Sequence, residues 1–259
     1  MFNEIATDEL SVFNEFSNRF CLDGKKVLEI GGSVPSAEVT KQKVKEWVSI
    51  DPLNDTNSTG LYKTIQGIAS DISYPDEYFD YVFSCNAFEH IGDLNETILE
   101  IKRILKPSGK VFAHYGPIWS APDGHHLDIS FEGNEYNFWE KQIIPNWFHL
   151  IYGPEELKTI LEEHYENNFV EKIIENTYKG SWINRLFYED YLNIFIKSGL
   201  TIEYLDTTTD IDYPYNFIVS PSRFSVYDEK QVSVMLAQKY TNNYKNFSCR
   251  DIKVILVKY

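Results

Sequence analysis

The sequence lacks the features of secreted, zinc-bound and membrane-spanning proteins. Its three cysteines, Cys21, Cys85 and Cys249, lie far apart and show no CxxC spacing, which argues against a structural zinc site and favours a reducing cytoplasm. The first ten residues, MFNEIATDEL, contain acids and no apolar core, unlike a signal peptide. No apolar run approaches the roughly 20 residues of a membrane helix. We expect a cytoplasmic protein without a membrane span.

Basic residues are also scarce. The 259 residues include 24 Lys and Arg against 39 Asp and Glu, which gives a formal net charge of -15. There is no Lys/Arg-rich run that could neutralise successive phosphates. Long nucleic acids are therefore unexpected partners, and a small-molecule partner is favoured. The composition leaves open whether the chain forms a homodimer.

Apolar and aromatic residues are abundant, at 43% and 15% of the chain. They are enough to form one large core. Short apolar runs that end at turn residues alternate with amphipathic helical segments such as 93–105. This alternation predicts a doubly wound, Rossmann-like α/β fold with a mostly parallel sheet. We expect seven strands, at 27–30, 47–50, 64–68, 78–84, 110–114, 200–205 and 252–258.

The pattern changes after the fifth expected strand. Residues 116–181 are rich in Trp, Tyr, Phe, His and Asn and contain two helical pieces near 154–165 and 169–178. We interpret 116–181 as an aromatic-rich helical lobe for substrate binding. It would be inserted into a single domain that spans residues 1–259.

Acidic residues and glycines follow the first three strands. Gly31 and Gly32 end the first strand directly after Glu29, Asp51 ends the second about 20 residues later, and Asp71 follows the third. A glycine turn at this position lets backbone approach a nucleotide, and an acid at that spacing can bind ribose hydroxyls. The G-x-G-x-x-G of a dehydrogenase is missing, and an acid before the glycines suits an ammonium better than a phosphate.

Five segments in order, VLEIGGSVPS, WVSIDP, GIASDIS, FDYVFSCNAFEHI and ILKPSGKVFAHYGP, resemble the motifs of class I S-adenosylmethionine-dependent methyltransferases. The resemblance implies S-adenosyl-L-methionine as cofactor, and it covers about residues 25–117. Only the first glycine of the family's E/D-x-G-x-G-x-G is in register. The implied cofactor contacts are Glu29, Gly31 and Gly32 at the methionine end, Asp51 and Pro52 at the ribose, Asp71 and Ile72 at the adenine, and Cys85 and Asn86 at the ammonium.

Histidines gather where the acceptor is expected. Transfer to a hydroxyl requires an in-line approach and a base or a metal to take the proton. His114 ends the fifth strand, and His125 and His126 follow in its loop; these are our candidate bases, with His125 or His126 favoured. A less favoured alternative is a divalent metal held by His114, His125, His126 and Asp128. A third is that the histidines only hydrogen-bond within a polar loop.

The acceptor itself is less defined. We expect His90, Trp119 and Asp123 to bind it, since the resemblance places His90 beside the sulfonium and Trp119 adjoins the strand-five loop. The segment GPIWSAPDGHH resembles the corresponding segment of methyltransferases from bacterial polysaccharide and natural-product gene clusters. This resemblance suggests O-methylation of a sugar or sugar nucleotide in polysaccharide biosynthesis. Alternatives are a natural-product hydroxyl, an amine, a phosphate-type oxygen, or a non-catalytic nucleoside-binding module.

Overall fold

The computed structural model describes residues 6, 8–32, 34–139, 143–208, 229–240 and 245–259. The chain divides into two compact units. The first contains residues 1–116, 190–208 and 251–259, and the second contains residues 117–189 and 209–250. The first unit is assembled from three separate stretches of chain, so its sheet is completed only when the last residues return to it.

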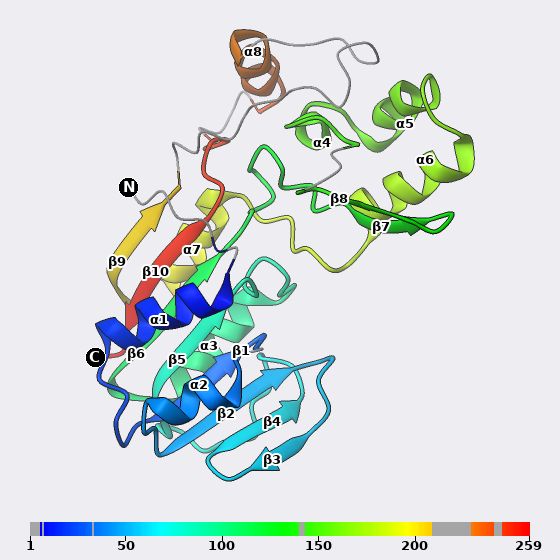
Figure 1. Ribbon diagram of the computed structural model, residues 1–259. Helices are drawn as coiled ribbons and strands as arrows, with labels where there is room; N and C mark the ends of the chain where they lie inside the picture. Colours follow the sequence, from blue (N-terminus) through cyan, green and yellow to red (C-terminus); the bar gives the residue numbers. More distant parts are fainter. Residues whose placement is uncertain (1–5, 7, 33, 140–142, 209–228, 241–244) are drawn as a thin grey trace. The chain divides into compact units, whose positions relative to one another are not determined.

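The first unit is built on a central sheet of eight strands (Figure 1). Five parallel strands, β4, β2, β1, β5 and β6, lie side by side in that order, and β3, β9 and β10 run antiparallel to their neighbours. The strands are β1 (Lys26–Ile30), β2 (Glu46–Asp51), β3 (Asn57–Thr59), β4 (Tyr62–Gln66), β5 (Phe79–Cys85), β6 (Leu105–Tyr115), β9 (Thr201–Thr207) and β10 (Ile252–Val257).

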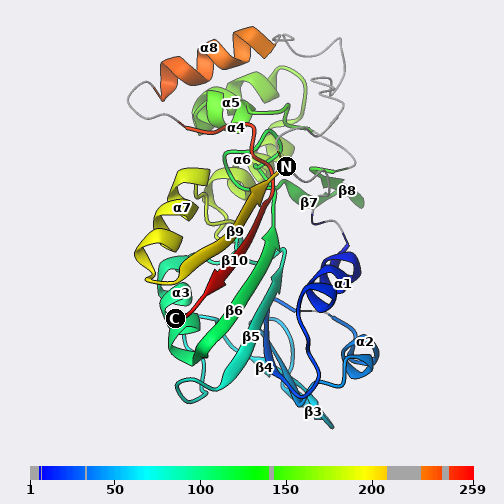
Figure 2. The same cartoon turned by 90° about the vertical axis from the view of Figure 1, so that its left-hand side faces the viewer.

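Helices cover both faces of this sheet. Figure 2 shows α1 (Glu9–Arg19) and α2 (Ser36–Lys41) on one face, and α3 (Leu94–Ile104) and α7 (Tyr188–Lys197) on the other. The α1 helix starts at Asp8, whose side chain accepts a hydrogen bond from the Leu10 amide, as expected of an N-cap. On the α1 face the ring of Phe16 lies 5.0 Å from that of Phe83, and both are fully buried. Each such ring contributes about 1.5–3 kcal/mol through burial.

The Rossmann-like fold expected from the alternation is confirmed, with a mostly parallel sheet between two helical layers. The expected number of strands is wrong, because the sheet has eight strands and not seven. The extra strand, β3, is three exposed residues long and pairs antiparallel with β4 at the sheet edge. Such a short polar strand has no apolar run by which a sequence pattern could reveal it.

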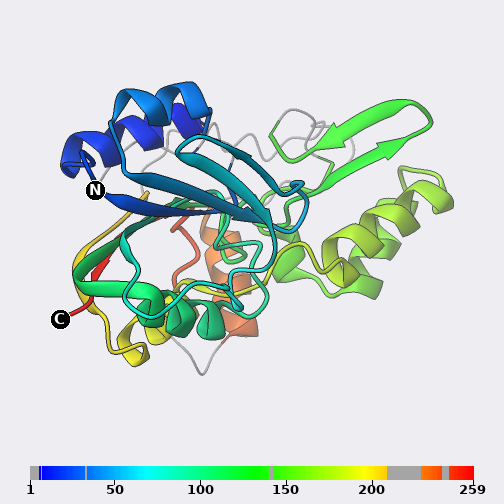
Figure 3. The same cartoon turned by 90° about the horizontal axis from the view of Figure 1, so that it is seen from below.

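The second unit has its own apolar core. A hairpin of β7 (Asp128–Phe131) and β8 (Asn134–Asn137) contacts α6, as Figures 1 and 3 show. Leu127, Leu161, Phe169 and Ile173 are among the buried side chains of this core. The helical elements of the unit are α4 (Phe148–Ile151), α5 (Pro154–Glu162), α6 (Asn167–Ile174), a π-helical turn (Glu175–Lys179) and α8 (Glu229–Lys239).

Residues 140–142 of the expected lobe and most of the expected loop before α8 lie outside the described residues. Across the part of the chain that is described, no helix combines the length and apolar character that a bilayer crossing requires.

Candidate functional site

The predicted cofactor residues gather at the carboxyl ends of neighbouring parallel strands. The amide of Gly31, after β1, donates to the carbonyl of Ile50 in β2 at 3.0 Å. The amide of Asn86, after β5, donates to the carbonyl of His114 in β6 at 3.1 Å. Because open α/β sheets bind ligands outside these strand ends, the first unit places Glu29, Asp51 and Asn86 where a nucleoside site forms.

The loop after β1 is built around the side chain of Glu29. Oε1 of Glu29 accepts a hydrogen bond from the Val34 amide at 3.0 Å, and Oε2 accepts one from Nε1 of Trp47 at 2.7 Å. The loop is also held from outside, where Nδ2 of Asn54 donates to the Gly32 carbonyl and the Tyr62 hydroxyl donates to the Val34 carbonyl. The carboxylate therefore fixes the path of the loop in this structure.

Burial makes the Glu29 carboxyl easy to protonate. Its side chain is fully buried, and the loss of solvation raises its pKa to about 8, although the hydrogen bonds from Trp47 and Val34 oppose the shift. The negative charge of Glu9 adds to the increase. An approaching cation would favour the ionised form and so bring this pKa down.

Two adjacent glycines are required here for different reasons. Gly31 has φ of +72°, and a Cβ atom on it would lie 2.4 Å from Cβ of Ala87. A Cβ atom on Gly32 would lie 2.0 Å from Cδ of Glu29. The departure from the family's glycine spacing thus has a local cause: at Gly32 the Glu29 side chain occupies the space that any other residue would need.

Asp51 ends β2 beside this loop. Its Oδ1 accepts a hydrogen bond from the Leu53 amide at 2.7 Å, which fixes the carboxylate in a half-buried position. Pro52 follows on the surface, and its carbonyl accepts from Nε2 of Gln66. One carboxylate oxygen of Asp51 can receive ribose hydroxyls while the other holds the turn, as the predicted role requires.

Apolar side chains lie on the surface near the expected adenine position. Leu53 is 88% exposed after β2, and Ile68 is 57% exposed after β4. Sequence reasoning gave neither residue a role, and it included Ile68 in the strand expected at 64–68, whereas β4 ends at Gln66. A flat, apolar purine ring would cover such side chains and so gain stability from burial.

Asp71 and Ile72 differ in what they can offer an adenine. Asp71 is exposed, whereas the Ile72 side chain is buried and its amide donates to Oε1 of Glu100 at 2.9 Å. An adenine nitrogen would take this amide only by replacing the Glu100 carboxylate. The predicted contact at Ile72 therefore involves a competition that the sequence did not indicate.

Cys85 and Asn86 lie at the end of β5. The Cys85 thiol is buried, and burial together with nearby carboxylates raises its pKa well above the usual value, so that it stays protonated. Asn86 has φ of +46°, and its Nδ2 donates to the Ala6 carbonyl. The backbone and Nδ2 N–H groups of Asn86 are thus committed to neighbouring segments, whereas its Oδ1 is buried without a hydrogen-bond partner. Its predicted contact with the ammonium would use backbone.

His114 lies next to a carboxylate that sequence reasoning missed. Its Nε2 is 3.8 Å from Oδ2 of Asp251, and both side chains are buried. Asp251 directly precedes β10, which is antiparallel to β6, so its start meets the carboxyl end of β6. Oδ2 of Asp251 also accepts the Ala6 amide at 2.6 Å. An imidazole beside a carboxylate can take a proton, which fits the base predicted at His114.

His90, the predicted acceptor contact, follows β5, whose last residue Cys85 pairs with His114 of β6. Its Nε2 is 4.0 Å from Oε1 of Glu89, with His90 partly exposed and Glu89 buried. Oε1 of Glu89 accepts the Gly116 amide at 3.1 Å. The first unit therefore contains two histidine–carboxylate pairs, one at the end of β6 and one after β5.

The remaining predicted residues belong to the second unit and are largely inaccessible. The ring of His125 is fully buried, and its Nδ1 accepts the Leu127 amide at 3.1 Å. Burial lowers the pKa of His125 to about 3, with a smaller contribution from His126, so the ring is neutral at pH 7. Nε2 of His126 lies 2.5 Å from the Pro117 carbonyl. In this arrangement both rings hold the loop 117–127 together.

Trp119 and Asp123 likewise form contacts within the second unit. Asp123 is paired with Nε of Arg250 at 2.9 Å, and both are buried. The carbonyl of Trp119 lies 2.8 Å from Nε2 of His149, and the indole packs edge-on against that imidazole. These contacts fix the loop that was expected to face an acceptor.

Groups of three or more side chains suited to hold a metal ion are absent among the described residues. The set proposed for a metal, His114, His125, His126 and Asp128, is divided between the two units, with His114 in the first. Asp128 is exposed at the start of β7.

The part of the chain that contains these strand ends and acidic residues is similar to a known protein family. Residues 17–113 match the family described as methyltransferase domain. These residues hold β1 to β5, all but the last two residues of β6, and every predicted cofactor contact. The first unit carries a class I S-adenosylmethionine-dependent methyltransferase domain. The resemblance seen in the five sequence segments is confirmed, and with it S-adenosylmethionine as the cofactor of this domain.

Two curated relatives match part of this chain. Sterol methyltransferase-like 1 of Botryococcus braunii is 31% identical over 123 residues, covering 41% of this chain and 31% of the relative. The ubiquinone/menaquinone biosynthesis C-methyltransferase of Rickettsia massiliae is 28% identical over 130 residues, covering 50% of this chain and 46% of the relative. The chain thus matches less than half the length of either.

A solved structure extends the similarity of fold to nearly the whole of this chain. It is described as a putative S-adenosylmethionine-dependent methyltransferase from Listeria monocytogenes. The two superpose with a TM-score of 0.53 at 13% sequence identity, covering 97% of this chain and all of the other. At this identity the likeness concerns the fold alone.

Proposed function

We propose that the protein transfers a methyl group from S-adenosyl-L-methionine to a small-molecule acceptor. The observation that carries this proposal is the loop after β1, which bends around the buried Glu29 carboxyl and leaves no space for a side chain on Gly31 or Gly32. Such a loop brings backbone close to a ligand beside a carboxyl group. The ammonium of the cofactor would provide the positive charge that a buried carboxylate favours.

Within this site the predicted contacts would bind different parts of the cofactor. Asp51 would bind the ribose hydroxyls, and Asp71, whose amide donates to the Ile68 carbonyl, would bind the adenine together with the exposed side chains of Ile68 and Leu53. Carbonyl groups at Cys85 and Asn86 would receive the ammonium. The cofactor supplies an electrophilic methyl group on a sulfonium, and the acceptor atom must approach this carbon in line with the bond that breaks.

For the acceptor we propose a hydroxyl of a sugar or sugar nucleotide of cell-surface polysaccharide synthesis. A hydroxyl must lose its proton as the carbon–oxygen bond forms, so the site requires a base. The pair of His114 and Asp251 supports this choice, because the imidazole can accept the proton while the carboxylate stabilises the resulting cation. The partly exposed His90 beside Glu89 is the other candidate for this task.

A carbon acceptor is the second candidate. It is favoured by the similarity to the Rickettsia massiliae relative, which is named as a C-methyltransferase. A carbon nucleophile of an electron-rich ring or alkene also loses a proton, but after the new bond has formed. The choice of acceptor atom therefore decides whether His114 is needed in the transfer step.

The test is transfer of labelled methyl groups from the cofactor to separate panels of acceptors. Sugar nucleotides and free sugars should become labelled, and the label should resist mild base, as expected of an ether. Labelling of quinol or isoprenoid acceptors with no labelled sugar would overturn the sugar proposal and leave methyl transfer in place. No labelled product from either panel, with the cofactor bound, would argue for a non-catalytic nucleoside-binding module.

A further inference from the structure

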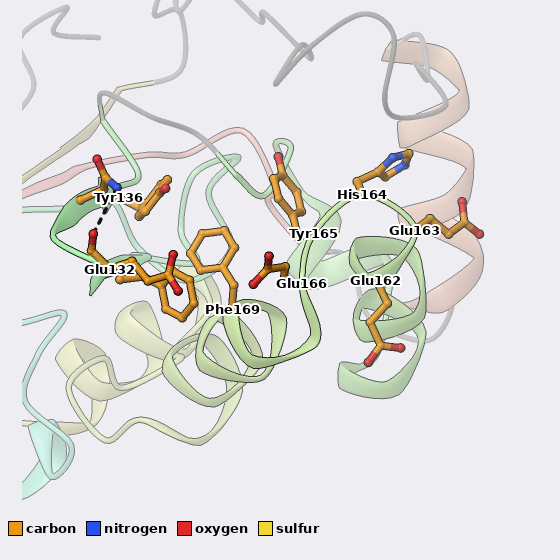
Figure 4. Close-up of a pocket in the computed structure, with 10 residues that line it drawn as sticks. Glu132, Tyr136, Glu162, Glu163, His164, Tyr165, Glu166 and Phe169 are labelled. Atoms are coloured by element: carbon orange, nitrogen blue, oxygen red, sulfur yellow. Dashed lines mark hydrogen bonds between the residues drawn. The ribbon is translucent and has the colours of Figure 1, made fainter.

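The second unit contains a pocket of about 500 Å³. The residues that line it come after every predicted cofactor contact in the sequence. It lies between the β7–β8 hairpin and the segment that joins α5 to α6 (Figure 4). Its volume is within the range of about 300–1,000 Å³ that is typical of small-molecule sites. All the side chains that line it belong to the second unit, so its shape depends on this unit alone.

The pocket has an aromatic wall. Phe169, in α6, is buried, and three half-buried rings pack around it. The centroid of the Phe169 ring is 4.7 Å from that of Phe131, 4.8 Å from that of Tyr136 and 5.6 Å from that of Tyr165. Phe169 also belongs to the core of the unit, which fixes the wall in place. The three outer rings keep part of their surface for a ligand.

Carboxylates outnumber the other titratable side chains that line this wall, with His164 as the one histidine among them. Glu132, Glu163 and Glu166 line the pocket and are exposed, and none of them forms an ion pair with a lysine or arginine of the described chain. A fourth acid, Glu162, forms an ion pair with Lys158 at 3.7 Å. Figure 4 shows Tyr165 and Glu166 on the segment that enters α6, with Phe169 at the first turn of that helix.

We propose that this pocket binds an organic cation with an alkylated ammonium head. The faces of aromatic rings attract such a cation, and the exposed carboxylates add Coulomb attraction. An anion would be repelled by the same carboxylates. A neutral ligand could pack against the rings but would gain nothing from the charge.

This site is separate from methyl transfer. The proposal does not depend on the function of the cofactor site, because no residue of the pocket is among the predicted cofactor contacts. The ligand is therefore an additional molecule that the second unit binds, and Tyr165 and Glu166 would recognise its alkylated ammonium.

Isothermal titration of the full chain with choline tests the proposal, with 3,3-dimethyl-1-butanol as an uncharged probe of the same shape. Choline should bind saturably and at least about 3-fold more tightly than the alcohol, the factor expected of a cation–π contribution at an accessible site. Equal affinity for the two probes, or no saturable binding of choline, would overturn the proposal.

Two variants locate the binding. Tyr165→Leu should weaken choline binding about 3- to 30-fold, and Glu166→Gln about 2- to 5-fold. Glu171→Gln is the control, since Glu171 is an exposed acid of the adjoining helix α6 that pairs with Lys158 at 3.3 Å and does not line the pocket. Thermal unfolding checks that each variant is folded. Unchanged choline affinity in both pocket variants, or an equal loss in the control, would show that choline binds elsewhere.

Discussion

The indole Nε1 of Trp47 donates a 2.7 Å hydrogen bond to Oε2 of Glu29, 18 residues earlier in the chain. Both side chains are fully buried, and Trp47 lies on β2 opposite Val27 in β1. The other Glu29 oxygen holds the Val34 amide. A single carboxyl group therefore connects the glycine loop to the second strand, which makes the geometry of the cofactor loop depend on residues outside it.

Substitution of Gly32 should disturb this connection directly. In Gly32→Ala the new methyl group would meet Cδ of Glu29 at 2.0 Å, so the carboxyl must move and release Val34 or Trp47. We expect a loss of about 1–3 kcal/mol in the free energy of unfolding, as for other overpacked sites. Denaturant unfolding measures this loss of stability, and titration with the cofactor measures the effect on cofactor affinity.

Gly92→Ala is the control for this substitution, because a Cβ atom there would have no neighbour within 4 Å. Equal stability and equal cofactor affinity in Gly32→Ala and Gly92→Ala would contradict the role assigned to Glu29 in shaping the loop.

The raised pKa of Glu29 predicts a pH dependence of stability. The folded protein keeps this proton up to about pH 8, whereas an unfolded chain releases it near 4.5, the ordinary pKa of a glutamate. Between these values the folded state binds the additional proton, so the free energy of unfolding contributed by Glu29 falls as pH rises through this window and levels off above it. Denaturant unfolding from pH 5 to 9 measures the trend.

Glu29→Gln imitates the protonated carboxyl and should remove this part of the pH dependence. Glu96→Gln, an exposed acid in the first turn of α3, should leave it unchanged. If the difference between wild type and Glu29→Gln were independent of pH, the Glu29 carboxyl would not titrate in this window.

Asp51 should determine cofactor affinity with little effect on the fold. Asp51→Ala removes the carboxylate that would receive the ribose hydroxyls, and hydrogen bonds to charged groups are worth about 1.5–3 kcal/mol, or roughly 10- to 150-fold in affinity. Asp55→Ala, an exposed acid four residues later, is the matched control. Similar affinities for the two variants would remove Asp51 from the site.

The pair of His114 and Asp251 should affect turnover more than binding. Asp251→Asn keeps the shape of the side chain but loses the charge beside Nε2 of His114, so kcat should fall at least about 10-fold, with the cofactor Kd within about 2-fold. His114→Asn should give a similar loss. If His90→Asn alone lowered kcat, the base would be the pair formed with Glu89.

Sequence reasoning predicted the parallel strands well, because apolar runs such as Val27–Ile30 end at glycine or aspartate and leave a clear local signal. It could not predict the three residues of β3, which carry no apolar pattern. It also missed Asp251, since only the antiparallel direction of β10 brings this residue to the end of β6.

The same limit applies to the histidines. A cluster such as His125 and His126 in a polar segment looks accessible when only neighbours in sequence are known. Their burial comes from packing partners such as Phe138, whose ring lies 4.8 Å from that of His126. The pattern identifies residue types, and only the fold determines which of them reach solvent.

The most direct test of the cofactor site is isothermal titration of the wild-type chain with S-adenosyl-L-methionine, S-adenosylhomocysteine and NAD. Both sulfur ligands should bind at one site with micromolar affinity, and NAD should not compete, because the loop lacks a pyrophosphate-binding glycine pattern. A fall in affinity of about 10- to 150-fold in Asp51→Ala would support the site as described. No binding of either sulfur ligand, or competition by NAD, would contradict it.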